Sequence, residues 1–487
     1  MALILHFYSG QCILFRIGDQ RKMSKNLFIK TFGCQMNEHD TEKIAGVLSS
    51  LGYSRTDSPD MADMIILNTC SVRDKAEHKC YSDLGRLEEL KKKNPGLLIG
   101  VGGCVAQQEG KRIVEKAPYV DLVFGTDNIG DIPGLLEKRN WKSKDRVSTE
   151  RRRRKSLMNR EEITSLPIMR DHPLKALVNI VDGCDKFCTF CVVPHTRGRE
   201  KSREPEDILK EIKGLASSGY KEVTLLGQNV DSYGKDLQKD VDLSGLLYRI
   251  NKITGIERIR FVTSHPADFS DKLIEAMASL PKVCEHLHLP LQSGSDSVLE
   301  RMNRNYTYSE YTDKINKLRE AIPDIAVTTD IITGFPGESD EDFSRTLTAL
   351  EEIRHDGVFT FRYSRRPYTP ARQYDGQIPL EVSKERLNKV IELQNSITIA
   401  KNQECIGREF EILIEGESKK DKKRLTGRTR GNKIVHIPNE NGISIGDKLR
   451  VRIKSATLAS LIGEIVYREN PPLPVAMLRS NGNPAPF

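Results

Sequence analysis

The sequence predicts an α/β protein in three parts: a parallel α/β domain, a partial (β/α)6 barrel, and a small closed β-barrel similar to an OB-fold. Three observations predict this arrangement. Strand-like apolar runs alternate with amphipathic stretches over residues 24–140, which is typical of a parallel sheet. The same alternation recurs six times over residues 170–403, short of the eight units of a full barrel. Five short strand patterns separated by turn residues occupy residues 404–468.

The composition is that of a globular protein with several cores. The chain has 487 residues, which at roughly 100–200 residues per domain predicts about three domains. A hydrophobic fraction of 38% and a charged fraction of 30% argue against a largely disordered chain. No apolar run approaches the roughly 18 residues of a membrane span, so we expect no membrane partner. Ten cysteines are too few for a disulfide scaffold, which favours a reducing, cytoplasmic location.

Three segments fall outside the predicted domains. Residues 1–23 lack the basic start and the small-residue cleavage site of a signal peptide, so we expect a disordered extension, with Met23 as an alternative start. Residues 141–169 form a basic linker, with nine Lys/Arg against two acidic residues over 141–160. This run is either a solvated linker or a phosphate-contacting hinge, and both interpretations stay open. The tail 469–487 is expected to be disordered.

In the first domain, three predicted strands each end in a cysteine. LFIKTF (27–32) leads to Cys34, MIILN (64–68) to Cys70, and LLIGVGG (97–103) to Cys104. Taken singly, each cysteine is more often a small buried residue than a ligand. The carboxyl ends of parallel strands, however, lie along one edge, where such sheets bind ligands. We therefore expect the three thiols to converge and to ligate three irons of a [4Fe–4S] cluster, leaving one iron open.

In the second domain, the strongest local signal is GCDKFCTFC, which follows the first barrel strand. Cys184, Cys188 and Cys191 have the spacing C-x3-C-x2-C and no fourth cysteine nearby, so a cubane held there would keep one open iron. An open iron can chelate S-adenosylmethionine (SAM) through its amino and carboxylate groups, and one electron then cleaves the sulfonium to a 5′-deoxyadenosyl radical. The alternative is a zinc site with His195 as fourth ligand. Its spacing is unusual for zinc, which makes it the weaker hypothesis.

The strand ends of this barrel also predict a SAM pocket. Six strands are expected at 176–183, 222–229, 258–264, 286–293, 326–334 and 359–364, and the carboxyl ends of barrel strands carry the catalytic loops. Polar groups at these ends and the turn TGFPGE can approach a cofactor closely. The residues predicted for the pocket are Gly227, Gln228, Ser293, Asp330, Gly334, Pro336 and Gly337. The sequence indicates no individual catalytic residue.

Several longer motifs resemble one known family. They include TFGCQMNEHDTE, NTCSVRDKAEHK, GGCVAQ, GCDKFCTFCVVPHTRGRE, HLHLPLQSGSDSVLERMNRNYT and TDIITGFPGESDEDF. Together they resemble the radical-SAM methylthiotransferases, most closely the tRNA-2-methylthio-N6-dimethylallyladenosine synthase (MiaB) type. The resemblance runs from about residue 26 to residue 467.

The resemblance implies a methylthiotransferase N-terminal domain, a radical-SAM core and a C-terminal TRAM domain. It implies that Cys184, Cys188 and Cys191 hold the SAM-cleaving cluster and that Cys34, Cys70 and Cys104 hold an auxiliary [4Fe–4S] cluster. The implied reaction uses two SAM molecules to place a methylthio group on C2 of N6-isopentenyladenosine at position 37 of tRNA. The implied partners are the tRNA anticodon stem-loop and an electron donor such as flavodoxin or ferredoxin, with the enzyme a monomer.

A basic C-terminal barrel suits an RNA partner, since residues 402–468 and the chain as a whole (+8) are both positive. We expect this barrel to hold the stem-loop over the mouth of the central barrel. One departure is Pro367-Tyr368-Thr369-Pro370, where the family commonly has Pro-Gly-Thr-Pro. Two roles are open for this tyrosine: stacking near the substrate base, or restricting the loop.

Three alternatives remain at this point. Two relatives of the same chemistry modify N6-threonylcarbamoyladenosine in tRNA or an aspartate of a ribosomal protein. The motif GCQMN around Cys34 favours the isopentenyladenosine enzyme. The third alternative, from another class, is a non-catalytic iron–sulfur RNA-binding regulator, which the complete set of SAM-site features disfavours.

Overall fold

The computed structural model describes residues 7–8, 11–12, 25–71, 74–137, 146–151 and 166–468. Of the predicted N-terminal extension, only the paired strands β1 (Phe7–Tyr8) and β2 (Gln11–Cys12) belong to the described residues. Most of the predicted basic linker and the tail 469–487 lie outside them. None of the helices in the described part of the chain has the length and apolarity needed to cross a membrane.

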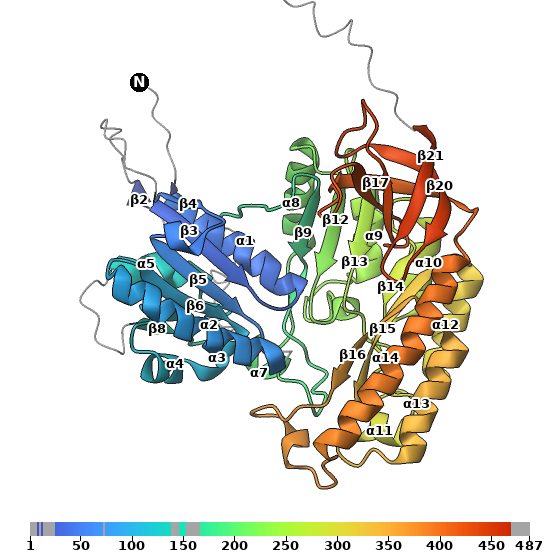
Figure 1. The fold of residues 1–487 in the computed structure, drawn as a ribbon, viewed down its shortest axis with the longest axis horizontal. Coiled ribbons are helices and arrows are strands. Elements are labelled where there is room, and N and C mark those ends of the chain that lie inside the picture. Colours follow the sequence, from blue (N-terminus) through green and yellow to red (C-terminus); the bar gives the residue numbers. More distant parts are fainter. Residues whose placement is uncertain are drawn as a thin grey trace, which may run out of the picture.

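The first domain is a six-stranded parallel sheet covered by helices (Figure 1). Its strand order is β4-β3-β5-β6-β7-β8. The strands are β3 (Lys25–Thr31), β4 (Tyr53–Arg55), β5 (Met64–Thr69), β6 (Leu98–Gly103), β7 (Leu122–Phe124) and β8 (Val147–Ser148). The helices are α1 (Gln35–Ser50), η1 (Pro59–Met61), α2 (Asp74–Lys93), α3 (Cys104–Glu109), α4 (Lys111–Lys116), η2 (Ile129–Asp131) and α5 (Ile132–Glu137).

The three predicted strands of this domain are confirmed as β3, β5 and β6, neighbours in the sheet. Their apolar runs fill the core because both faces of a parallel sheet are covered by helices. The strands β4, β7 and β8 were not predicted, since two or three residues are too few to show a periodic pattern. β8 lies inside the predicted linker and pairs with β7, so the sheet extends past residue 140.

The six predicted strands of the central domain are also confirmed. They form two parallel three-stranded sheets, β13-β12-β9 and β14-β15-β16, joined by a bridge between Ile259 and Val283. A single large core of branched aliphatic side chains fills this partial barrel. The strands are β9 (Lys175–Asn179), β12 (Glu222–Leu226), β13 (Arg258–Phe261), β14 (His286–His288), β15 (Ala326–Thr333) and β16 (Gly357–Arg362), with a small antiparallel pair β10 (Val181–Asp182) and β11 (Lys201–Ser202).

Helices follow the barrel strands and form its outer wall (Figure 1). They are α7 (Val193–Thr196), α8 (Pro205–Ser217), η4 (Val230–Ser232), α9 (Leu243–Asn251), α10 (Asp271–Ser279), α11 (Asp296–Arg301), α12 (Tyr308–Ala321), α13 (Asp340–Ile353), η5 (Pro370–Gln373) and α14 (Leu380–Gln403). The last helix, α14, leads directly into the C-terminal barrel.

The C-terminal domain is a closed five-stranded barrel, as predicted, and its strand order is β17-β18-β19-β21-β20. Its interior is apolar, with Ile412, Val435 and Val451 fully buried. The strands are β17 (Glu409–Glu417), β18 (Arg424–Thr429), β19 (Ile434–Pro438), β20 (Lys448–Ala456) and β21 (Leu461–Arg468).

The C-terminal barrel docks on the amino ends of the central strands (Figure 1). Arg258, the first residue of β13, is 1% exposed and pairs with Glu411 at 2.7 Å. Lys175, the first residue of β9, pairs with Glu415 at 2.9 Å. The cysteine loops follow the carboxyl ends of strands. Charged residues at the strand starts thus hold this barrel at the end of the central domain opposite to the cysteine loops, whereas the expectation that it holds an RNA stem-loop over the mouth stays a prediction.

Candidate active site between two cysteine triads

Three cysteines of the first domain lie together at the carboxyl edge of its sheet. Cys34 caps α1 after β3, Cys70 follows β5, and Cys104 is the first residue of α3, directly after β6. The three positions meet because β3, β5 and β6 are neighbours. The Cys70 thiol hydrogen-bonds to Cys34, and Cys34 lies near enough to Cys104 for their charges to interact. We name these three cysteines the auxiliary triad.

A glycine and two asparagines allow two loops of the auxiliary triad to pack closely. Gly33 has φ +112°, and a Cβ there would lie 2.4 Å from Cys70 Cβ, so only glycine fits. The buried Asn37 side chain donates from Nδ2 to the Thr69 carbonyl at 2.8 Å. In return, Asn68 Nδ2 donates to the Asn37 carbonyl at 2.8 Å. These paired amides hold the first cysteine loop against the second.

A buried arginine of the barrel domain reaches the auxiliary triad. Arg197, directly after α7, donates to Asp40 Oδ2 at 2.6 Å and hydrogen-bonds to the Cys104 thiol. The hydrogen bond from Cys70, together with the positive charge of Arg197, lowers the pKa of the Cys34 thiol to about 6. Burial raises the pKa of Cys104. The auxiliary triad thus holds one readily ionised thiol beside a fixed positive charge.

Cys184, Cys188 and Cys191 form a second group, which we name the barrel triad. They lie in the loop after β10, near the carboxyl end of the first barrel strand. They are close enough that ionisation of one thiol would raise the pKa of another. The Cys191 amide donates to the Cys188 carbonyl at 2.9 Å, which folds the loop tightly. Burial raises the pKa of both Cys184 and Cys191 to about 12. Any metal that these sulfurs bind would therefore have to displace their protons.

The segment after α11 holds the barrel triad in place. Arg304 is buried and donates to Cys188 Sγ at 3.4 Å and to the Pro290 carbonyl at 2.9 Å. Asn303 donates to the carbonyl groups of Lys186 and Phe187 within the cysteine loop. Each triad therefore has one buried guanidinium against one of its sulfurs: Arg304 on Cys188 and Arg197 on Cys104.

A cavity of about 610 Å³ is lined by residues from the loops that carry the two triads. Cys191 of the barrel triad lines it, and so does Ser71, the residue that directly follows Cys70 of the auxiliary triad. Its volume lies in the range of small-molecule sites, roughly 300–1,000 Å³. β15 and β16 form much of the wall, and their paired side chains alternate between polar and apolar groups. The lining includes Gln292, which follows β14, and Asp330, Ile332, Phe359, Phe361 and Arg362 of β15 and β16.

Gln292 gives the cavity an acceptor that no described residue uses. Its backbone has φ +70°, and its buried Oε1 receives no hydrogen bond within the described part of the chain. Leaving a buried acceptor unpaired costs about 1–3 kcal/mol, which favours a ligand donor at this point. Asp330 adds a carboxylate, 3.5 Å from His288 Nε2. The amino group and the ribose hydroxyls of SAM can donate hydrogen bonds to Gln292 Oε1 and to the Asp330 carboxylate.

Of the seven residues predicted for the SAM pocket, Asp330 lines this cavity. Gln228 accepts a hydrogen bond from the Gly183 amide and so holds the start of the cysteine loop. Ser293 is fully buried and lies 3.2 Å from Thr346 Oγ1. The residues that lie outside the lining of this cavity are Gly227, Gln228, Ser293, Gly334, Pro336 and Gly337.

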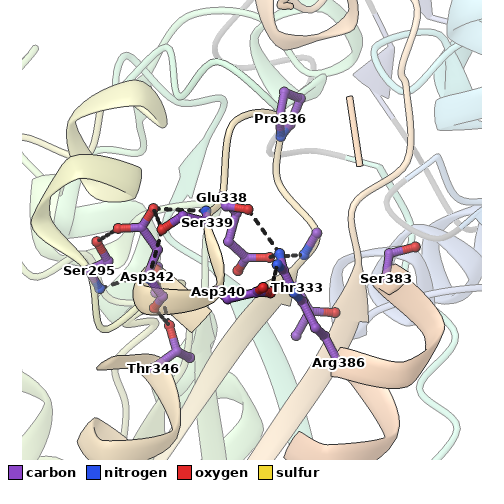
Figure 2. Close-up of polar contacts among 12 residues, drawn as sticks. Ser295, Thr333, Pro336, Glu338, Ser339, Asp340, Asp342, Thr346, Ser383 and Arg386 are labelled. Atoms are coloured by element: carbon purple, nitrogen blue, oxygen red, sulfur yellow. Dashed lines mark hydrogen bonds and ion pairs between the residues drawn. The ribbon is translucent and has the colours of Figure 1, made fainter. Parts of the chain in front are cut away.

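The glycine-rich turn after β15 is occupied by side chains of its own domain (Figure 2). The Gly334 amide donates to Glu338 Oε2 at 2.6 Å, and Arg386 of α14 donates to the same oxygen at 2.7 Å. Arg386 also donates to Asp340 Oδ1 at 2.7 Å. The turn therefore ties β15 to α14. Gly334 borders a separate cavity of about 260 Å³ beside the larger one.

Each triad suits an iron–sulfur cluster better than a single metal ion. A structural zinc needs several donors gathered around one ion. Within the described ranges, no three His, Cys, Asp or Glu side chains gather closely enough for that. In a cubane each thiolate binds a different iron, so three spaced thiols fit and leave one iron for another ligand.

Three features of the site were not predicted from the sequence. They are the buried residues Arg197 and Arg304, the position of Ser71 in the cavity lining, and the cavity wall formed by β16. Arg197 and Arg304 carry no pattern that separates them from the many exposed arginines. The alternation of FTFR in β16 was available as a signal, because Phe359 and Phe361 lie on one face at period two.

Comparison with protein families divides the chain into three matches. Residues 26–125 match the family described as uncharacterized protein family UPF0004, residues 178–350 the radical SAM superfamily, and residues 403–466 the TRAM domain. The second match makes SAM and [4Fe–4S] clusters the cofactors of this chain.

A solved structure with a related fold is the radical S-adenosylmethionine methyltransferase TsrM from Kitasatospora setae. It has a TM-score of 0.52 and 14% sequence identity, and the alignment covers 72% of this chain and 77% of that one. At this identity the likeness concerns the fold alone.

Curated relatives are far closer in sequence. A tRNA-2-methylthio-N(6)-dimethylallyladenosine synthase of Thermoanaerobacter sp. (strain X514) is 50% identical over 461 residues, covering 93% of this chain and 96% of that protein. The synthase of Clostridium perfringens (strain SM101 / Type A) is 48% identical over 452 residues, covering 92% and 99%. With two cysteine triads, a cavity between them and relatives this similar over nearly its whole length, the chain belongs to the tRNA-2-methylthio-N(6)-dimethylallyladenosine synthase family of radical-SAM enzymes.

Proposed function

We propose that this enzyme places a methylthio group on C2 of N6-isopentenyladenosine at position 37 of tRNA, using the cavity between the two triads. The observation that carries the proposal is the lining of that cavity, which includes both Cys191 of the barrel triad and Ser71, the residue beside Cys70 of the auxiliary triad. A base held in this space lies between the two sulfur sites. The C2–H bond of adenine resists acid–base attack, so a site built for radical chemistry suits it.

We assign the barrel triad to the cluster that binds SAM and the auxiliary triad to a second cluster. When bound, these clusters supply a one-electron reduction and a reservoir of sulfur. The chain supplies the ligands and the charges around them: Arg304 donates to Cys188, and Arg197 to Cys104. Hydrogen bonds to ligand sulfur favour the thiolate and fix its orientation.

The cavity wall supplies binding and exclusion of water. Gln292 Oε1 and the Asp330 carboxylate accept hydrogen bonds from the polar groups of SAM. Ile332, Phe359 and Phe361 form an apolar surface that suits an isopentenyl group and the flat face of adenine. When SAM and the base fill the cavity, they displace water from it. The absence of water protects a reactive radical from side reactions.

The RNA partner is the anticodon stem-loop, where a single-stranded base can turn outward. The basic C-terminal barrel contributes contacts to the RNA backbone, at the far end of the central barrel from the mouth. An electron donor such as flavodoxin or ferredoxin completes the system. We further propose that the enzyme acts as a monomer in the cytoplasm, where its RNA substrate is found.

Mass spectrometry of tRNA nucleosides tests the function. A strain that lacks this gene should lose 2-methylthio-N6-isopentenyladenosine and accumulate N6-isopentenyladenosine. The intact gene should restore the product, whereas Cys34→Ala and Cys188→Ala should not. Cys284→Ala is the matched control, since Cys284 is a buried cysteine outside both triads.

Unchanged tRNA in that strain would contradict the proposal. Loss of 2-methylthio-N6-threonylcarbamoyladenosine, or of a methylthio group on a ribosomal protein, would instead identify one of the two related reactions. A fully reconstituted, reduced enzyme that forms no 5′-deoxyadenosine from SAM would point to a non-catalytic regulator.

A further inference from the structure

An exposed tyrosine with a strained backbone lies beside the cavity. Tyr368 has φ +66° and is 58% exposed. For a bulky residue, the left-handed conformation is energetically unfavourable. Burial of the ring does not offset that cost, because most of its surface meets solvent. A ligand that stacks on the exposed ring would explain why a tyrosine occupies this strained position.

The Tyr368 ring is paired with a histidine of the cysteine loop. Its centroid lies 5.7 Å from that of His195, and the two planes are inclined by 32°. His195 is exposed and belongs to α7, which starts two residues after Cys191. The turn that carries Tyr368 is fixed to the same loop, since the Ala371 amide donates to the Thr189 carbonyl at 3.0 Å. Val193 and Arg366, each two residues away from one of these rings, line the cavity, so the two rings lie close to it.

The segment around Tyr368 is strongly basic. Residues 362–375 contain four arginines and one acidic residue, Asp375. Arg365 and Arg372 are exposed, and neither forms an ion pair with any residue that the structure describes. Arg365 Nε only donates to Gln377 Oε1, at 3.1 Å, which orients it. Exposed aromatic rings among uncompensated arginines are the features that bind single-stranded nucleic acid.

We propose that Tyr368 and His195 form a stacking platform for a base of the anticodon loop next to the adenosine that enters the cavity, and that Arg365 and Arg372 contact the adjoining phosphates. This inference rests on the proposed function, because it takes the same RNA loop as substrate. It also provides contacts at the mouth that the C-terminal barrel, docked at the other end of the strands, does not provide.

The test is the affinity of the full-length enzyme for a fluorescein-labelled anticodon stem-loop that carries N6-isopentenyladenosine, measured by fluorescence anisotropy. Loss of one stacked base corresponds to about a 5- to 150-fold weaker affinity. We expect Tyr368→Gly to lose this much and Tyr368→Phe, which keeps the ring, to stay within about twofold of the unaltered enzyme. Because glycine removes the strain, the Tyr368→Gly enzyme should not melt at a lower temperature, which separates loss of binding from unfolding.

Salt dependence separates the arginines from the rings. The double variant Arg365→Gln/Arg372→Gln should reduce the slope of log affinity against log salt by about 1.4, for two phosphate contacts on a single strand. Tyr368→Gly should leave this slope unchanged. The matched controls are Tyr248→Ala, an exposed tyrosine on α9, and Arg112→Gln, an exposed arginine on α4.

The outcomes distinguish the two proposals. If the unaltered enzyme binds and modifies the stem-loop while Tyr368→Gly binds within twofold of it, the stacking platform is wrong and the proposed function stands. If the unaltered enzyme neither binds nor modifies this RNA, the proposed function fails, and the platform fails with it.

Discussion

Two buried arginines, one against each triad, are the residues with the most direct influence on the sulfur sites. Arg304 touches Cys188 and Arg197 touches Cys104, so each guanidinium lowers the net negative charge around one set of thiolates. Removing a positive charge and a hydrogen bond from a cluster ligand makes the cluster harder to reduce.

We therefore predict that Arg304→Met shifts the midpoint potential of the barrel-triad cluster to more negative values, by on the order of tens of millivolts. Arg197→Met should shift only the auxiliary cluster. Redox titration followed by electron paramagnetic resonance measures both. Each variant is the control for the other, and a shift of both clusters in either variant would contradict the assignment.

Asp231 should make stability depend on pH. Burial raises the pKa of Asp231 in the folded protein to about 7, although Ser264 and the His265 amide donate to its carboxylate. Because this value lies above that of the unfolded chain, the folded state binds more protons between about pH 4 and pH 7. The contribution of Asp231 to stability is thus fully present below this window and is lost as the pH rises through it.

Asp231→Asn should remove this loss. Relative to the unaltered protein, the variant should gain stability as the pH rises from 5 to 8, by at most about 1.4 kcal/mol per pH unit. Urea denaturation at four pH values measures the difference. A difference that is constant with pH would show that Asp231 does not titrate in this range.

At the residue scale, the sequence predicted where the cysteines fall but not what surrounds them. Each cysteine of the auxiliary triad ends a strand that apolar periodicity marks clearly. Among the predicted pocket residues, Asp330 reaches the cavity, whereas Ser293 and Gly337 are taken up by packing within the domain. Whether a strand-end side chain points to the cavity depends on the local twist and loop path, which the pattern does not contain.

At the scale of elements, the turn after β15 depends on one buried ion pair (Figure 2). Glu338 is 3% exposed, and Arg386 of α14 is the cation beside it. Arg386→Met would leave the carboxylate buried without a partner, which costs about 3–5 kcal/mol. Chemical denaturation should show this loss, and adding Glu338→Gln should recover part of it.

The control for that prediction lies on the same helix. Lys384 pairs with Glu381 on the exposed face of α14, so Lys384→Met should change stability by no more than about 0.5 kcal/mol. Equal losses of stability in the Lys384→Met and Arg386→Met variants would contradict a special contribution of the buried ion pair.

Elements were the scale at which sequence reasoning succeeded best. All six central strands and all five strands of the C-terminal barrel were predicted, because each lies in a longer strand-like run of the sequence; β14, with three residues, lies within HLHLPLQS. Short strands at the edge of the first sheet were not. β8 shows why: its two residues lie in a highly charged stretch, and pairing with β7 alone makes them a strand.

At the scale of the whole molecule, buried charges join the domains. Arg258 is almost fully buried between the central and C-terminal barrels, where it donates to Glu411 and to the Arg428 carbonyl. We predict that Arg258→Met loosens this docking and speeds trypsin cleavage after Arg408, in the connection between α14 and β17. Arg452→Met, which breaks an exposed pair with Glu409 in the same barrel, should leave the rate unchanged. Equal cleavage of both variants would contradict a role for Arg258 in docking.

The position of the C-terminal barrel could not be predicted, because docking depends on which surface charges meet. Arg258, Arg260 and Glu285 lie at the starts of strands and look like ordinary charged strand residues in the sequence. Only the assembled structure shows that they face the partners Glu411 and Arg430.

The separation of the C-terminal barrel from the cysteine loops has a consequence for how such a protein changes over generations. Substitutions that alter how the C-terminal barrel grips RNA fall in a domain that lies at the starts of the central strands, and those that alter chemistry fall at the strand ends. The two sets share no side chain, so one can be selected while the other stays constant. A lineage can thereby adopt new RNA partners without rebuilding its reaction centre.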